Sequence, residues 1–393
     1  MSSKTKPTPM LLPKLRFPEF RDMKGWEPSL LGNLFSQREE TGNTDLRLLS
    51  LMDKEGIVPQ EDTNRKNNAS GDRSKYLRVA PGDIAYNTMR MWEGRSALSK
   101  LEGIVSPAYT VCVPTPEANS LFFSHYFRTP QLIAQFARYS QGLVKDTLNL
   151  KFEAFARISA STPSDPAEQQ KIADCLDSVD KLMAAQARKV DALKTHKKGL
   201  MQQLFPREGE TQPLLRFPEF KDGWTEATFG ELCSSISSGR DTKDVDGEFH
   251  LYGSTGVIGK TALASYSNPH ILVARVGANA GHLTKADGHF GVTDNTLVIS
   301  LKPGVEIDFA FYYLGNININ KLIFGSGQPL ITGGVLKALH VLIPSLSEQK
   351  KISTHLSSLD GYIHAEIQKM EALWNHKNGL MQQLFPAGEE LET

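Results

Sequence analysis

Two stretches of the chain carry apolar residues at positions that alternate in steps of four and three. Over residues 172–204 and again over 352–384, eight of ten such positions are apolar, through about four and a half heptads. A sustained period of 3.5 residues is typical of a coiled-coil seam, whereas a helix that only packs on its own domain rarely keeps it this long. The pattern predicts two long helices. Each ends before a Phe-Pro pair, because proline disfavours helical backbone in the residue before it.

The predicted helix starts carry capping signals. Asp165 precedes a proline suited to the first helical turn, and Glu168 follows three residues after Asp165. Ser345 and Glu348 have the same spacing in the second stretch. A side chain that accepts hydrogen bonds at the N-cap, with Glu three residues later, is typical of a capping box.

The region ahead of each helix has a different pattern. Short runs of β-type residues are separated by glycines and prolines, as at 82–87, 109–113, 271–275 and 297–301. These runs predict a mixed α/β or mainly β globular domain before each helix.

The chain is also a tandem repeat. The motif Arg-Phe-Pro-Glu-Phe occurs at 16–20 and at 216–220, and a Gly-Trp pair follows shortly after each copy. The sequence Gly-Leu-Met-Gln-Gln-Leu-Phe-Pro ends both predicted helices, at 199–206 and 379–386. Repetition of this kind indicates two copies of one structural plan.

The predicted fold class is therefore α+β, with two globular α/β-type domains, each followed by a long helix, in a pseudo-twofold tandem repeat. The two helices are expected to pair as an antiparallel coiled coil. The predicted division is a first domain with an N-terminal arm at 1–163, a first helix at 164–206, a second domain at 207–344, and a second helix with an acidic tail at 345–393.

The polar members of the two seams predict how the helices are aligned. They are Gln186 and Lys197 in the first helix, and Glu366 and Lys377 in the second. Because a buried charge without a partner is costly, we expect these residues to face one another. This predicts Lys197 opposite Glu366 and Lys377 opposite Gln186. The overlap would be roughly 39 Å of helix, near the roughly 34–36 Å of one DNA turn.

Composition limits the class of protein. Lys plus Arg and Asp plus Glu each number 44, so the formal net charge is zero. A basic field over the whole chain is excluded, although a local basic face is not. The three cysteines show no C-x-x-C spacing, which disfavours a disulfide framework or a zinc site and suits a reducing compartment. No apolar run has the length of a membrane span or a signal peptide, so we expect a cytoplasmic protein without a membrane partner.

Candidate catalytic chemistry is sparse. The segment Gly253–Thr261 resembles a phosphate-binding P-loop, but five residues instead of four separate Gly253 from Gly259. The extra residue moves the lysine and threonine away from the phosphate position. The ten histidines form no metal-ligand pair at motif spacing. We therefore predict no catalytic residue, no metal ligand and no cofactor bound by this chain.

The globular regions contain basic, amide and aromatic residues that could contact DNA. Arginine and asparagine suit the edges of guanine and adenine, and lysine suits phosphates. A loop after the run 82–87 and the corresponding loop after 271–275 carry such groups, although a solvated surface would look similar. The predicted DNA-binding residues are Lys75, Tyr86, Asn87, Arg90, Trp92, Arg95, Ser254, Thr255, Arg275, Asn279, His282 and Lys285.

The two halves are alike in different degrees. The helix ends are almost identical, including Gln202 and Gln203, which lie off the seam. The globular regions share only the order of their motifs. The comparison indicates one kind of partner bound twice and two different ligands bound once each.

Taken together, these motifs resemble the specificity subunits of type I restriction–modification systems. The resemblance rests on the repeated Arg-Phe-Pro-Glu-Phe and Gly-Trp motifs, the Glu-Gln-x-x-Ile helix starts at 168–172 and 348–352, the repeated helix ends, and the stretch 252–259. It covers nearly the whole chain.

The resemblance implies a non-catalytic subunit that reads a bipartite, asymmetric site in double-stranded DNA. Each globular part would be a target recognition domain, and the helix pair would set the distance between the half-sites. Two modification subunits would bind S-adenosylmethionine and methylate adenine. Restriction subunits would add translocation and cleavage with ATP and Mg. The alternatives from other classes are a nucleotide-dependent enzyme using Gly253–Thr261 and a coiled-coil scaffold that does not bind DNA.

Overall fold

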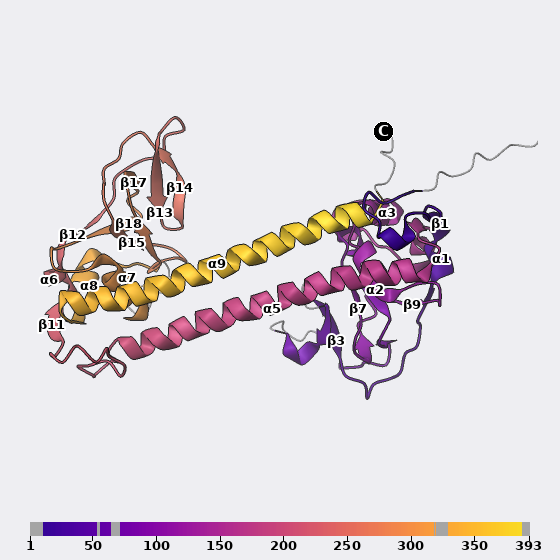
Figure 1. The fold of residues 1–393 in the computed structure, drawn as a ribbon, viewed down its shortest axis with the longest axis horizontal. Coiled ribbons are helices and arrows are strands. Elements are labelled where there is room, and N and C mark those ends of the chain that lie inside the picture. The colour runs from indigo at the N-terminus through magenta and orange to yellow at the C-terminus, as the bar shows by residue number, and fades with distance from the viewer. Residues whose placement is uncertain (1–10, 53–55, 64–70, 318, 320–328, 387–393) are drawn as a thin grey trace, which may run out of the picture. The chain divides into compact units, whose positions relative to one another are not determined.

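The computed structural model describes residues 11–52, 56–63, 71–317, 319 and 329–386 (Figure 1). The predicted N-terminal arm lies largely outside these residues, and the predicted acidic tail lies entirely outside them. The chain forms two compact units. Unit 1 comprises Met1–Gln186 and Lys369–Thr393, and unit 2 comprises Ala187–Gln368. Both units contain helices and strands, which confirms the predicted α+β class.

The two predicted long helices are present as α5, Pro166–Leu204, and α9, Leu346–Leu384, each of 39 residues. At the start of α5, the Asp165 carboxylate accepts a hydrogen bond from the Ala167 amide at 2.8 Å, as the capping signal predicts. The boundary between the units falls inside both helices. Each unit therefore holds the first part of one helix beside the last part of the other, in antiparallel directions. The division of the sequence into four parts stays a prediction.

Unit 1 contains a four-stranded antiparallel sheet with the order β2-β9-β6-β7, and three two-stranded ladders, β1–β10, β3–β4 and β5–β8. The strands are β1 Glu27–Leu30, β2 Phe35–Gln37, β3 Leu49–Met52, β4 Gly56–Pro59, β5 Leu77–Val79, β6 Ile84–Asn87, β7 Ser96–Leu98, β8 Gly103–Val105, β9 Tyr109–Pro114 and β10 Ser159–Thr162. The shorter helices are α1 Leu31–Leu34, α2 Ser120–Tyr126, α3 Pro130–Tyr139 and α4 Phe152–Phe155.

Aromatic rings fill the core of unit 1, and both long helices contribute to it. The ring of Trp26 lies 5.7 Å from Phe122 and 6.1 Å from Phe385, measured between centroids. Phe385 follows the last turn of α9 and stacks on Tyr126 at 4.8 Å. Ile172, near the start of α5, belongs to the same buried cluster. The end of α9 is therefore an integral part of this core.

Unit 2 contains a four-stranded sheet with the order β12-β18-β15-β16, a three-stranded sheet β14-β13-β17, and the ladder β11–β19. The strands are β11 Thr225–Thr228, β12 Cys233–Ser238, β13 Phe249–Gly253, β14 Gly256–Thr261, β15 His270–Ala274, β16 Leu283–Ala286, β17 Phe290–Val292, β18 Thr296–Leu301 and β19 His340–Ile343. The shorter helices are α6 Phe229–Leu232, α7 Ile307–Ile317 and α8 Gly333–Lys337.

The core of unit 2 repeats the plan of unit 1. Trp224 packs edge-on against Phe309 at 5.9 Å. Phe205, which follows the last turn of α5, lies 5.6 Å from Phe309 and 5.4 Å from Tyr313. The end of α5 thus completes this core as the end of α9 completes the other.

The repeated Arg-Phe-Pro-Glu-Phe motif fixes the start of each long helix. Arg16 donates to both carboxylate oxygens of Glu168 at 2.8 and 2.7 Å, and Trp26 Nε1 donates to the same carboxylate at 3.2 Å. Arg216 and the equivalent tryptophan make the same contacts with Glu348, at 2.7, 2.7 and 3.3 Å. Both glutamates are 1% exposed. A buried carboxylate requires such partners, so the motif has a structural role.

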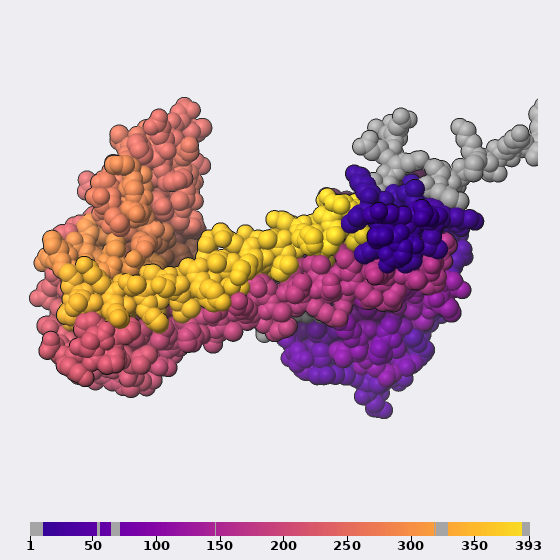
Figure 2. Space-filling view, viewed as in Figure 1, coloured from indigo at the N-terminus to yellow at the C-terminus, as the bar shows by residue number. Residues whose placement is uncertain are grey.

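The leucine just before each copy of the motif binds the end of a long helix. In unit 1 the Leu15 amide donates to the Gln383 carbonyl at 2.9 Å, and in unit 2 the Leu215 amide donates to the Gln203 carbonyl at 2.9 Å. Figure 2 shows the N-terminal residues, in indigo, against the yellow end of α9 within unit 1. These contacts involve the backbone of the second glutamine in each repeated helix end.

The predicted helix register is wrong. Lys197 pairs with both oxygens of Asp360, at 2.5 and 2.6 Å, instead of with Glu366. Lys377 pairs with Asp180 at 2.6 Å instead of with Gln186. The observed register differs from the predicted one by about six residues.

The partners of the seam residues come from positions beside the seam. Glu366 is 1% exposed and pairs with Lys189 at 3.1 Å. Lysine side chains are long enough to leave an apolar seam and place the ammonium group at its edge. Seam residues therefore did not need to face one another for their charges to be paired.

The segment Gly253–Thr261 is not a P-loop. It forms the turn and second strand of the β13–β14 hairpin, in which Gly253 pairs with Gly256 and Lys260 pairs with His250. A P-loop requires a loop that leads into a helix, whose N-terminal amides bind phosphate. The nucleotide-loop interpretation is therefore wrong. Within the described ranges, no helix combines the length and apolar character that a membrane crossing requires.

Candidate nucleic-acid interface

In unit 1, the last residue of β6 and the loop that follows it carry four of the predicted residues, Asn87, Arg90, Trp92 and Arg95. The Asn87 side-chain oxygen accepts a hydrogen bond from the Met89 amide at 3.0 Å, and Trp92 Nε1 donates to the Met89 carbonyl at 3.0 Å. A 3-10 turn at Met91–Glu93 follows, and the Met91 side chain is fully buried. The loop is thus held from within, and it presents polar side chains from a fixed backbone.

Arg90 and Arg95 flank one carboxylate in this loop. Arg90 Nη1 lies 3.0 Å from Glu93 Oε1, and Arg95 Nε lies 3.0 Å from Glu93 Oε2. The side chains are 47%, 39% and 28% exposed for Arg90, Arg95 and Glu93. Gly94 makes this geometry possible because its φ of 76° is in the left-handed region, and a Cβ there would lie 2.8 Å from Ile133. Both exposed guanidinium groups thus contact the same carboxylate.

A second loop lies beside the first. The Leu150 amide donates to the Thr88 carbonyl at 2.8 Å, which ties the hairpin-like segment 141–149 to the Arg90 loop. Gln141 and Asn149 exchange two backbone hydrogen bonds of 2.9 Å. Leu143 and Val144 between them are 101% and 61% exposed. Sequence reasoning assigned no role to these two apolar side chains.

Unit 2 builds the equivalent loop with different side chains. The Arg275 amide donates to the Asn295 carbonyl at 2.9 Å, as the Thr88 amide donates to Ala108 in unit 1 at 3.1 Å. The Ile331 amide donates to the Arg275 carbonyl at 2.9 Å, as Leu150 does to Thr88. The backbone of Arg275–His282 therefore corresponds to that of Thr88–Arg95.

The side chains of this unit 2 loop are those that the sequence singled out. Asn279 and His282 are exposed, and Arg275 is half-buried. Asn279 and His282 line a cavity of about 490 Å³ whose other residues are Lys197, Met201, Ala278, Ala280, Gly281, Leu283, Phe311, Tyr312, Leu314, Gly315 and Ile319. Arg275, Asn279 and His282 thus belong to one loop, and two of them share one hollow.

Other predicted residues lie elsewhere or are unsuitable. Tyr86 is fully buried and packs on Phe155 at 5.4 Å, so its prediction as a DNA contact is wrong. Burial raises its pKa above the ordinary value of tyrosine. Both faces of strand β6 are covered, so its alternating side chains gave no sign of which residue is exposed.

The remaining four predicted residues are not part of the two loops. Lys285 in β16 forms an ion pair with Asp308. Lys75 is exposed in the turn before β5, and Ser254 and Thr255 form the turn of the β13–β14 hairpin.

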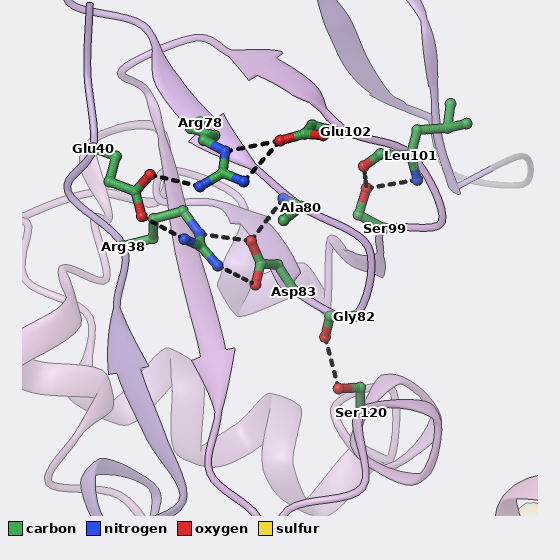
Figure 3. A network of polar contacts seen from close by, with 10 residues as sticks. All are labelled: Arg38, Glu40, Arg78, Ala80, Gly82, Asp83, Ser99, Leu101, Glu102 and Ser120. Atoms are coloured by element: carbon green, nitrogen blue, oxygen red, sulfur yellow. Dashed lines mark hydrogen bonds and ion pairs between the residues drawn. The ribbon is translucent and has the colours of Figure 1, made fainter. Parts of the chain in front are cut away.

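A second polar network in unit 1 has a structural role (Figure 3). Arg38 donates to both oxygens of Asp83, at 2.8 and 3.0 Å, and Asp83 is 2% exposed. Glu40 bridges Arg38 and Arg78, and Arg78 also pairs with Glu102 at 2.7 Å. The two acids hold the pKa of Arg78 above its ordinary value. Each arginine of this network therefore has two acidic partners.

Among the described residues, no three histidine, cysteine, aspartate or glutamate side chains lie close enough together to hold a metal ion. The three cysteines are free thiols.

The chain is similar to specificity subunits of type I restriction–modification systems in sequence and in fold. Residues 221–373 match the family model of the type I restriction modification DNA specificity domain. The EcoprrI specificity subunit of a type I restriction enzyme from Escherichia coli is 29% identical over 154 residues, which are 37% of this chain and 38% of that protein.

Two relatives come from Methanocaldococcus jannaschii. The putative MjaX specificity subunit is 25% identical and covers 59% of this chain and 60% of its own length. The MjaVIII specificity subunit is 23% identical and covers 80% and 82%. The chain thus matches less than two thirds of the length of EcoprrI and MjaX, and about four fifths of MjaVIII.

Solved structures show the same fold. The type I restriction-modification S subunit from M. genitalium has a TM-score of 0.59 at 14% identity, over 96% of this chain and 99% of that one. A chain from a study of complex assembly and conformational transition of the type I R-M system has a TM-score of 0.57 at 16% identity, over 92% and 98%.

Proposed function

We propose, from the membership of residues 221–373 in the type I restriction modification DNA specificity domain family, that this chain recognises DNA for a type I restriction–modification complex. The family match and the relatives confirm the resemblance to specificity subunits that the sequence motifs indicated. The finer roles below are our proposal.

The observation that carries the proposal is the contrast between like backbones and unlike side chains. The same backbone contacts hold the Thr88–Arg95 loop in unit 1 and the Arg275–His282 loop in unit 2. The first loop presents Arg90 and Arg95, whereas the second presents Asn279 and His282. Different donor and acceptor groups on one scaffold suit the reading of two different base sequences.

The contacts that repeat between the units serve another purpose. The Arg16–Glu168 and Arg216–Glu348 pairs belong to the structural plan that is repeated in the two halves of the chain. The repeated helix ends offer a duplicated surface, because the side chains of Gln202 and Gln203 and of their counterparts Gln382 and Gln383 are exposed. Such a surface suits a partner that binds twice, and two methyltransferase subunits would meet that description. S-adenosylmethionine, ATP and Mg would then belong to the modification and restriction subunits, and this chain would have no catalytic centre.

Methyl transfer by the reconstituted complex tests this function. Purified chain with S-adenosylmethionine and DNA is expected to transfer no methyl group. Addition of the methyltransferase subunit is expected to produce methylation at one bipartite sequence, read by sequencing of modified bases. Methylation by the chain alone would contradict the non-catalytic role.

A second measurement separates this function from that of a scaffold. The complex should retard a duplex that carries the modified sequence at lower concentration than a random duplex of equal length. Equal binding of both duplexes, or binding of neither, would favour a scaffold that does not read DNA.

A further inference from the structure

Glu93 is the acidic residue of the loop that presents Arg90 and Arg95. Its two oxygens are divided between the two guanidinium groups, each at 3.0 Å. The Glu93 amide also donates to the Arg90 carbonyl at 3.0 Å, so the backbone of the 3-10 turn fixes the spacing of the pair. Both arginines are more exposed than Glu93. The acid thus lies between two groups that reach solvent.

A surface acid in a DNA-binding loop has an electrostatic cost. It repels phosphates and weakens binding to every sequence, because most non-specific affinity comes from phosphate contacts. An arginine reads guanine best when its fork is oriented to meet two acceptors at once. A carboxylate that holds the guanidinium in place favours this geometry and disfavours a free swing toward the backbone.

We propose that Glu93 is a positioning residue that sets the sequence discrimination of unit 1. It orients Arg90 and Arg95 toward base edges and lowers their attraction for phosphates. The inference rests on the proposed function of this loop. It assigns to Glu93 a role that lowers the affinity for DNA in general and increases the discrimination between sequences.

Unit 2 has no acid at this place. Its equivalent loop has Ala280 where unit 1 has Glu93, and Ala280 is buried. Its exposed groups, Asn279 and His282, are an amide and an imidazole. The positioning acid accompanies the arginine pair and is absent from the loop without one.

Glu40 offers a matched control in the same unit. It also bridges two arginines, Arg38 and Arg78, which pair in addition with Asp83 and Glu102 (Figure 3). Its side chain is 49% exposed. Glu40→Gln removes the same charge from an arginine bridge outside the proposed interface.

The experiment uses the full chain in complex with its methyltransferase subunits. The recognised sequence is first read from the bases that the complex methylates. Equilibrium binding is then measured with that duplex, with duplexes changed at single positions of the half-site that unit 1 reads, and with random duplex, each at several salt concentrations.

Glu93→Gln is expected to bind random duplex several-fold more tightly, with a salt dependence steeper by about one phosphate contact. Its discrimination against the changed half-site should fall by roughly tenfold at one or two positions. Glu93→Asp keeps the charge but cannot reach both guanidinium groups, so it should lose discrimination without gaining affinity for random duplex. Glu40→Gln should match the unchanged protein in both respects.

Two results would overturn the inference. One is a Glu93→Gln complex whose affinity rises by the same factor for every duplex, since this shows only a lost repulsion. The other is discrimination equal to that of the unchanged complex. A failure of the proposed function looks different, because the unchanged complex would then prefer no sequence at all. Thermal unfolding of each variant checks that the loop substitution leaves the fold intact.

Discussion

His125 holds in unit 1 the place that Tyr312 holds in unit 2. Tyr312 donates a hydrogen bond to Asp360 at 2.7 Å, beside the Lys197 ammonium group. His125 Nδ1 lies 3.9 Å from Asp180, which pairs with Lys377. The histidine is 5% exposed, and its Nε2 has no hydrogen-bond partner among the described residues. Burial, then the positive charge of Lys377, lower the pKa of His125 to about 4.

This histidine is expected to make unit 1 sensitive to acid. Its folded pKa of about 4 lies below the ordinary value of 6.5, so the unfolded chain binds the proton more tightly. The contribution of the neutral His125 to the free energy of unfolding is complete above about pH 6.5 and is lost as the pH falls toward 4. Between pH 7.5 and 5 the loss is on the order of 2 kcal/mol. Urea unfolding at both pH values should show this loss in the unchanged chain and not in His125→Gln.

Equal pH dependence in His125→Gln and in the unchanged chain would show that the pKa of His125 does not differ between the folded and the unfolded state.

Single residues were the hardest feature to predict from sequence. Arg90 and Tyr86 are four positions apart and both looked suited to DNA, yet one is exposed and the other is fully buried. The difference arises because β6 is covered on both faces, which no local pattern reveals. Glu93 was visible only as one acid among several basic residues, since its role depends on the turn at Gly94.

At the scale of elements, the two long helices were predicted well because their seam repeats over many turns. Their register was not, because it depends on side chains that lie beside the seam. Asp180 and Asp360 each follow a seam residue, and each forms an ion pair with the seam lysine of the other helix. The conformation of the segment Gly253–Thr261 could not be predicted from its own residues either, because it is set by hydrogen bonds to the neighbouring strand β13.

A double-mutant cycle tests the observed register. Lys197→Met and Asp360→Asn should each destabilise unit 2, and their coupling should be about 0.5–1 kcal/mol, since both side chains are partly exposed. The cycle of Lys197→Met with Glu366→Gln should show coupling near zero. Urea unfolding provides the free energies. Coupling in the second cycle and none in the first would restore the register read from the seam.

At the scale of the whole molecule, the tandem repeat made the architecture predictable. Two copies of each motif show which contacts the fold requires and which regions are free to differ. The repeated arginine, glutamate and tryptophan form the same cluster in both units. The two exposed loops carry different side chains, so comparison of the two halves gave no prediction of how those side chains are arranged.

Exchange of one domain tests whether the two units read DNA independently. Replacement of residues of about 24–160 by the equivalent segment of a relative should change one half of the methylated sequence and preserve the other, because the loops of each unit are built from its own strands. Replacement within 207–344 should change the opposite half. Sequencing of modified bases gives both results. Changes in both halves after either exchange would contradict independent reading.

The division of α9 between the units determines the order in which the protein can be completed during synthesis. Every residue of unit 2, 187–368, is made before residues 369–393, which belong to unit 1. The cluster of Trp26 and Tyr126 is therefore completed by Phe385 only after all of unit 2 has been made. Domains of a growing chain ordinarily fold in the order of their synthesis. Here the half that leaves the ribosome first is the last to close its core.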